Sequence, residues 1–190
     1  MMWTCNAVDV AAVGDGLVGE AIESPRSRLS YTAIGEYAQR IADEHDVCDP
    51  DTGYVDVHSL LTKLGGQIEI DNGEESLTIN GIGDFIVHIP AHTTRRRDRF
   101  TIAHELGHYF LHFRAPDEYL AGDRLLRATR MGRNVGETQA NVFASNLLMP
   151  ARAFTDALSQ TGSIRDVARI FDVSVPAARV RADYLGLSSE

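Results

Sequence analysis

The chain has 190 residues, 44% of them hydrophobic, and a formal net charge of −9. A chain of this length can bury the core of one domain, while its negative charge argues against general affinity for nucleic acid, which depends on neutralising phosphates. No stretch approaches the roughly 18 apolar residues of a membrane span and no secretion signal begins the chain, so we expect a cytoplasmic protein with no membrane contact.

Residues 1–28 show no hydrophobic periodicity and contain several glycines and scattered acids. This composition is typical of a segment without stable structure. We therefore predict a flexible N-terminal extension over residues 1–28 and one folded domain over residues 29–190.

Two helices are predicted at the start of the folded domain. Hydrophobic residues recur at three- and four-residue spacing, first at Ile34, Tyr37, Ala38 and Ile41, and then at Val57, Leu60, Leu61 and Leu64. This spacing places each set on one face of a helix. Pro50 and the Gly65-Gly66 pair follow the two runs and are expected to end them.

A small sheet is predicted next. Residues 67–70, 77–80 and 85–89 form short β-branched or alternating runs, and residues 81–84 between the last two are typical of a hairpin turn. These runs predict a sheet of three strands.

The segment His104-Glu105-Leu106-Gly107-His108 follows the sheet. Residues four apart on a helix share a face and lie roughly 6 Å apart along the axis, so both imidazoles can reach one metal ion. A catalytic zinc keeps one position for water and needs a third protein ligand. Glu105 projects beside that position, where a carboxylate can act as general base.

Another helix is predicted from Glu137 to Pro150, where the proline ends it. The connection between the two helices is long enough to bring Glu137 beside the histidines as the third ligand, although an ordinary solvated glutamate at a helix start is the alternative. Asn141 lies one turn later and is placed to hydrogen-bond a ligating imidazole. Gly107 and Ala140 keep the facing surfaces small, as close helix packing requires.

His112 extends the histidine series by one more turn. It lies eight residues from His104, about 12 Å along the helix axis, and no glycine turn brings the chain back toward the ion. We therefore predict that His112 is a packed or supporting histidine and not a metal ligand.

Residues 95–133 carry nine basic and five acidic groups and are the only basic part of the chain. The arginines fall into two sets, Arg95, Arg96, Arg97 and Arg99 before the histidines and Arg124, Arg127, Arg130 and Arg133 after them. They can belong to solvated loops, or they can form a basic rim that steers an acidic or polar peptide.

Residues 163–187 are predicted to form a pair of helices. Ser163 and Asp166 resemble a capping box, and Ser174 begins a second helix that carries Arg179 and Arg181. Such a pair resembles a DNA-reading unit, but the segment is nearly neutral. A DNA-binding regulator therefore stays a less favoured alternative.

Residues 54–66, 99–108, 137–150 and 167–174 together resemble the ImmA/IrrE family of zinc metallopeptidases. The resemblance implies an α+β, zincin-like domain that includes the C-terminal helices. It implies one Zn²⁺ ion held by His104, His108 and Glu137, with Glu105 as the catalytic base. It also makes residues 85–89 the candidate edge strand for pairing with substrate, although pairing inside the sheet is equally compatible with the pattern.

The resemblance further implies a role, because such proteins typically cleave a helix-turn-helix transcriptional repressor and so relieve repression. We therefore expect a zinc endopeptidase whose partner is a protein substrate, with no direct nucleic-acid binding. The alternative is a zincin-fold binding module, such as one half of a toxin–antitoxin pair, that sequesters its partner. The presence of Glu105 favours the enzyme, because binding alone does not need a general base.

Overall fold

The computed structural model describes residues 2–3, 27–73, 75–114, 126–129 and 135–187, and these form the predicted α+β fold. Most of the extension predicted over residues 1–28 lies outside the described residues. In chain order the elements are β1 (Met2–Trp3), α1 (Tyr31–Glu44), α2 (Val57–Lys63), β2 (Gly66–Asp71), β3 (Ser76–Gly81), β4 (Asp84–Pro90), α3 (Arg95–His108), the π-helix η1 (Tyr109–Arg114), β5 (Leu126–Thr129), α4 (Val135–Leu148), α5 (Ala151–Thr161), α6 (Ile164–Ile170) and α7 (Val175–Tyr184).

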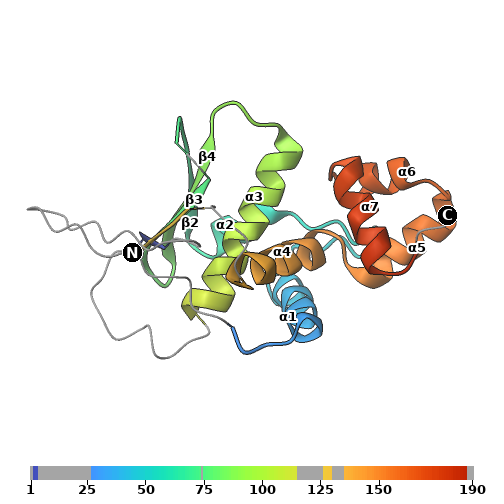
Figure 1. Ribbon diagram of the computed structural model, residues 1–190, viewed down its shortest axis with the longest axis horizontal. Coiled ribbons are helices and arrows are strands. Elements are labelled where there is room, and N and C mark those ends of the chain that lie inside the picture. The colour runs from blue at the N-terminus through green and yellow to red at the C-terminus, as the bar shows by residue number, and fades with distance from the viewer. Residues whose placement is uncertain (1, 4–26, 74, 115–125, 130–134, 188–190) are drawn as a thin grey trace, which may run out of the picture.

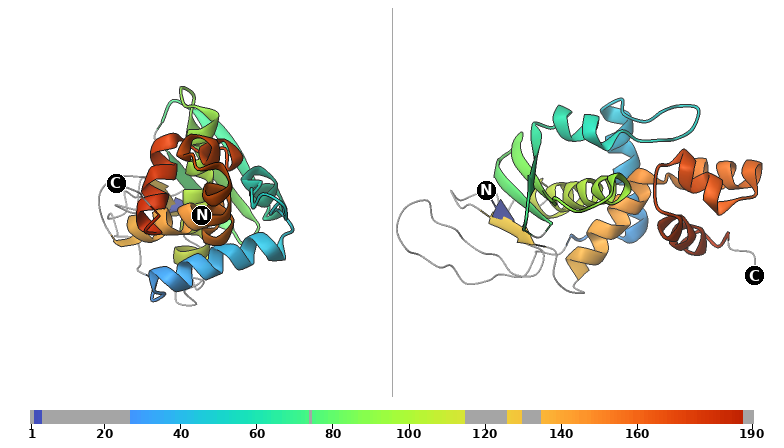
Figure 2. Two further views of the ribbon diagram at one scale, coloured as in Figure 1. Left: turned by 90° about the vertical axis from the view of Figure 1, so that its right-hand side faces the viewer. Right: turned by 90° about the horizontal axis from the view of Figure 1, so that it is seen from above.

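The elements are arranged in layers behind the sheet. Helix α3 runs along one face of the sheet, α4 crosses α3, and α1 packs against α4 (Figure 1). Helices α5, α6 and α7 form a cluster at the far end of α4, away from the strands (Figure 2). None of the helices in the described part of the chain is long and apolar enough to cross a membrane.

The two predicted N-terminal helices are present. Ser30 caps α1 by accepting a hydrogen bond from the Ala33 N–H, and Asp56 caps α2 in the same way. Gly65 follows the C-terminal end of α2 and has a φ of +80°, and a Cβ added to it would lie 2.1 Å from the Gly83 carbonyl oxygen. The position therefore requires glycine for both its backbone conformation and its close contact with the hairpin.

The three predicted strands are β2, β3 and β4. Strand β4 pairs in parallel with β2 and forms a hairpin with β3, so the strand order is β1-β3-β4-β2. Of the two possibilities for residues 85–89, pairing inside the sheet is confirmed and the edge position is wrong, because a strand lies on each side of β4. Strand β3 also pairs antiparallel with the short strands β1 and β5, which the sequence pattern did not predict.

The hydrophobic core lies between the sheet and the helices. Phe85 and Val87 of β4 are fully buried, as are Ile102 and Leu106 of α3. Tyr109 follows α3 and stacks on Phe85 with ring centroids 4.3 Å apart. These contacts fix α3 against the sheet and so set the position of the histidines near its C-terminal end.

The predicted C-terminal pair corresponds to α6 and α7, which Ser163 and Ser174 cap as expected. Sequence reasoning missed α5, which begins directly after the proline that ends α4. Arg181 of α7 is 1% exposed, and it donates to the Met149 carbonyl oxygen at 3.0 Å and to Asn146 Oδ1 at 2.9 Å. This buried arginine therefore joins α7 to the end of α4 and is not available to contact DNA.

Candidate metal centre

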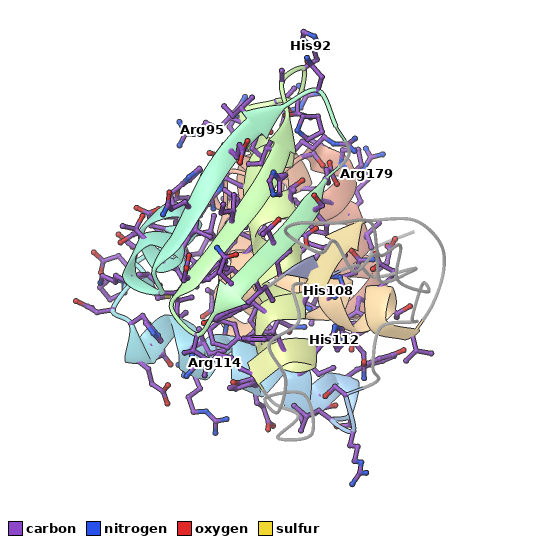
Figure 3. The ribbon with its side chains drawn as sticks, turned by 90° about the vertical axis from the view of Figure 1, so that its left-hand side faces the viewer. His92, Arg95, His108, His112, Arg114 and Arg179 are labelled. Carbon is purple, nitrogen blue, oxygen red and sulfur yellow. The ribbon has the colours of Figure 1, made fainter. Side chains whose placement is uncertain are left out.

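The two motif histidines lie on one face of α3 near its C-terminal end, and Glu137 faces them from the first turn of α4. His108 and His112 are labelled in Figure 3, where α3 continues into η1. The Nε2 atoms of His104 and His108 are 3.0 Å apart. Glu137 Oε2 lies 3.4 Å from His104 Nε2, and Glu137 Oε1 lies 3.2 Å from His108 Nε2. Three potential ligand atoms thus converge from two helices.

The spacing of these four atoms, two imidazole nitrogens and the two oxygens of one carboxylate, fits a metal ion. Ligands about 2.0–2.1 Å from a tetrahedral zinc lie roughly 3.3 Å from one another. The three separations of 3.0, 3.2 and 3.4 Å surround that value. All three side chains are buried, so the converging acceptor atoms have little access to water. A cation bound between these atoms would stabilise the arrangement, and the donor set of two imidazoles and a carboxylate suits zinc.

The two helices can approach this closely because their facing residues are small. A Cβ added to Gly107 would lie 3.0 Å from the Ala140 Cα atom and 3.2 Å from the Phe143 Cβ atom. The close packing predicted for Gly107 and Ala140 is therefore confirmed. It places His108 and Glu137 within reach of each other.

Glu105 lies next to His104 in α3 and is fully buried.

Asn141 and His112 contact the outer nitrogens of the two histidines. His104 Nδ1 donates to Asn141 Oδ1 at 3.0 Å, which is the contact predicted for Asn141. His108 Nδ1 lies 2.8 Å from His112 Nδ1. His112 thus faces the side of the His108 ring opposite Glu137, which is where a supporting histidine would lie.

The pKa values of these groups favour metal binding. Burial lowers the pKa of His108 to about 3 and that of His112 to about 4. Burial acts to raise the pKa of Glu137, but the nearby side chains of His104 and His108 outweigh it, so this pKa lies below the ordinary carboxyl value. Neutral imidazoles and an ionised carboxylate are the protonation states that metal binding requires.

Sequence reasoning missed Gln139 as part of this site. Its side chain is 3% exposed, and its Oε1 atom lies 3.3 Å from His112 Nε2. The same amide forms two hydrogen bonds with the main chain of Ser27. A polar residue on the helix that carries Glu137 was the one available signal, but its partner is 112 residues away in the chain.

The arginines before the histidines lie on a helix and not in a loop. They lie in the first turns of α3, where Arg97 pairs with Glu75 at 2.8 Å and Arg95 and Arg96 pair with Asp172. Arg99 is 1% exposed. The side chains of Arg95 and Arg97 are 78% and 61% exposed, so these two arginines are solvated as expected, and the basic rim stays a prediction. The side chains of Arg124, Arg127, Arg130 and Arg133 lie outside the described part of the chain.

The fold and the convergence of these side chains are typical of metallopeptidases of the HExxH type, and comparison with known proteins leads to the same class. The model of the IrrE N-terminal-like domain matches residues 75–183, more than half of the chain. The chain therefore belongs to this metallopeptidase family, and the resemblance predicted from sequence is confirmed.

Two curated relatives are each similar over about two thirds of this chain. The metallopeptidase ImmA of Bacillus subtilis is 28% identical over 131 residues, and the match covers 68% of this chain and 68% of ImmA. The radiation response metalloprotease IrrE of Deinococcus deserti is 35% identical over 143 residues, with 65% of this chain and 45% of IrrE covered. The matched region thus spans about two thirds of ImmA and less than half of IrrE.

Proposed function

We propose that the protein is a zinc-dependent endopeptidase that cleaves a specific protein, a helix-turn-helix transcriptional repressor, and thereby relieves repression in the cytoplasm. The observation that carries this proposal is the triangle formed by His104, His108 and Glu137 with the buried Glu105 beside it. Family membership supports the peptidase chemistry. The repressor substrate rests on the resemblance to the ImmA/IrrE proteins.

Each of the four residues has a proposed role. His104, His108 and Glu137 would hold zinc, which when bound supplies Lewis-acid polarisation of the scissile carbonyl and makes water more acidic. Glu105 accepts the proton of the attacking water and later delivers it to the leaving amine. The burial of these side chains limits competing water and strengthens the electrostatic interactions among them. Asn141 keeps the His104 ring in one orientation.

We also propose that residues 29–190 act as one peptidase domain. Buried arginines support this proposal, because Arg181 joins α7 to the end of α4 and Arg99 joins α3 to the turn before α7. The C-terminal helices would then position the peptidase centre and do not form a separate DNA-binding unit.

The test separates an enzyme from a binding module. Zinc-loaded protein is incubated with a candidate helix-turn-helix repressor, and the intact masses of both proteins are followed, alongside a reporter assay of repression. Wild type should cleave the repressor at a defined bond, and Glu105→Gln should slow cleavage by roughly 10²–10⁴-fold while it retains zinc, because only the proton acceptor is lost. Equal relief of repression by both proteins, with the repressor full length in each case, would show that the protein acts by binding.

A further inference from the structure

A continuous hydrogen-bonded chain leads from His108 to the main chain just before α1. His108 Nδ1 lies 2.8 Å from His112 Nδ1, and His112 Nε2 lies 3.3 Å from Gln139 Oε1. The Ser27 N–H donates to Gln139 Oε1 at 3.1 Å, and Gln139 Nε2 donates to the Ser27 carbonyl oxygen at 2.8 Å. His108, His112 and Gln139 are all buried, so the contacts among them are protected from water, while the two bonds with Ser27 are partly buried.

The main chain of Ser27 sets the direction of every bond in this chain. Its N–H needs an acceptor and its carbonyl needs a donor, so the Gln139 amide can lie in only one orientation. With Oε1 of Gln139 as the acceptor, His112 donates from Nε2. A neutral His112 then accepts at Nδ1, so His108 donates from its own Nδ1.

This direction leaves the lone pair of His108 on Nε2. That atom lies 3.2 Å from Glu137 Oε1 and 3.0 Å from His104 Nε2, at the proposed metal position. A histidine ligand usually donates its outer N–H to a carboxylate, a carbonyl or water, and loss of that partner typically weakens metal binding 10–100-fold. Here the imidazole of His112 is the partner of the His108 N–H. His112 accepts at Nδ1 only while its proton stays on Nε2, and that proton needs an acceptor of its own.

We infer that His112, Gln139 and the Ser27 peptide groups are positioning residues that hold His108 in its zinc-binding tautomer. This inference rests on the proposed zinc centre. It gives the segment before α1 a part in metal binding, since the peptide groups of Ser27 hold the amide at the end of the chain of bonds. Asn141 performs the corresponding task for His104 through a separate contact.

The test is the zinc affinity of purified variants, measured by competition with a chelator, together with the melting temperature of each metal-free protein. Gln139→Met keeps the length of the side chain and removes both hydrogen-bonding groups. It should weaken zinc binding about 10–100-fold, as should His112→Leu. The double variant should be little weaker than either single variant, because both changes break one chain of bonds. Gln139→Met combined with Asn141→Leu should show the product of the two single effects, because these residues support different ligands.

Two controls separate positioning from general stability. Gln39→Met removes a comparable hydrogen bond between α1 and α4, from Gln39 Nε2 to the Asn146 carbonyl oxygen, and should leave zinc affinity unchanged. Ser27→Ala keeps both main-chain bonds and should also bind zinc as wild type does. Ser27→Pro removes the N–H donor and should weaken binding, though less than Gln139→Met.

The outcomes distinguish this inference from the proposed metal centre. If wild type binds no zinc, the centre itself is wrong and the inference falls with it. If wild type binds zinc but Gln139→Met and His112→Leu bind it within about twofold of the Gln39→Met control, the centre stands and the positioning role is overturned. Multiplicative effects of Gln139→Met and His112→Leu would likewise contradict a single chain of bonds.

Discussion

Arg99 donates a hydrogen bond from Nη2 to the main-chain oxygen of Phe171 at 3.4 Å, and so joins the helix that carries the metal motif to the turn between α6 and α7. The same guanidinium donates to the Tyr54 hydroxyl at 2.6 Å and to the Val55 carbonyl oxygen at 3.1 Å. One buried side chain thus connects α3 to the segment before α2 and to the C-terminal helices.

Arg99→Met should lower the free energy of unfolding by about 2–4 kcal/mol, because the buried carbonyl oxygens of Val55 and Phe171 lose their donor. Denaturant unfolding measures this change. Arg152→Met is the matched control, since the Arg152 side chain is 96% exposed and its loss should change stability by less than about 0.5 kcal/mol. If both variants lose less than about 0.5 kcal/mol of unfolding free energy, Arg99 does not join these elements.

Gly107→Ala should weaken both folding and zinc binding. The new methyl group would contact the backbone of Ala140, and overpacking of this kind costs about 1–3 kcal/mol, more than the roughly 1 kcal/mol gained from the helix preference of alanine. Separation of α3 from α4 would also move His108 away from Glu137. Gly81→Ala is the control, because a Cβ at that position has no neighbour within 4 Å. Full zinc affinity in Gly107→Ala would contradict the close packing.

Asn141→Leu should weaken zinc binding about 10–100-fold, because the His104 ring loses the acceptor for its Nδ1–H. Asn141→Asp should keep or strengthen binding, since a carboxylate accepts this hydrogen bond more strongly than an amide does. Chelator competition measures both affinities. If Asn141→Leu binds zinc as tightly as wild type, the orientation of His104 is set by other contacts.

Local sequence patterns predicted the parts of the fold that depend on local chemistry. The spacing of Ile34, Ala38 and Ile41 gave the buried face of α1, and the strand runs gave β2, β3 and β4 close to their observed bounds. Helix geometry predicted that His104 and His108 share a face and that Glu137 and Asn141 share a face, while the resemblance to the family supplied the expectation that the two pairs meet.

Relationships between distant segments could not be predicted in this way. The order of strands depends on which edges pair, so the sequence left open whether β4 lies at the edge or inside the sheet. The sequence pattern predicted a basic segment at the arginines of α3. Their acidic partners Glu75 and Asp172 lie far away in the chain, so the pattern could not show these ion pairs. The π-helical turn that carries His112, and the contact of Gln139 with Ser27, likewise depend on tertiary packing.

The metal content of the purified protein tests the central claim most directly. Elemental analysis should find about one zinc per chain in wild type and in Glu105→Gln, and little in Glu137→Ala, because only the last change removes one of the three converging ligands. Absence of zinc from wild type after exposure to the metal, or full retention of zinc by Glu137→Ala, would contradict the proposed centre.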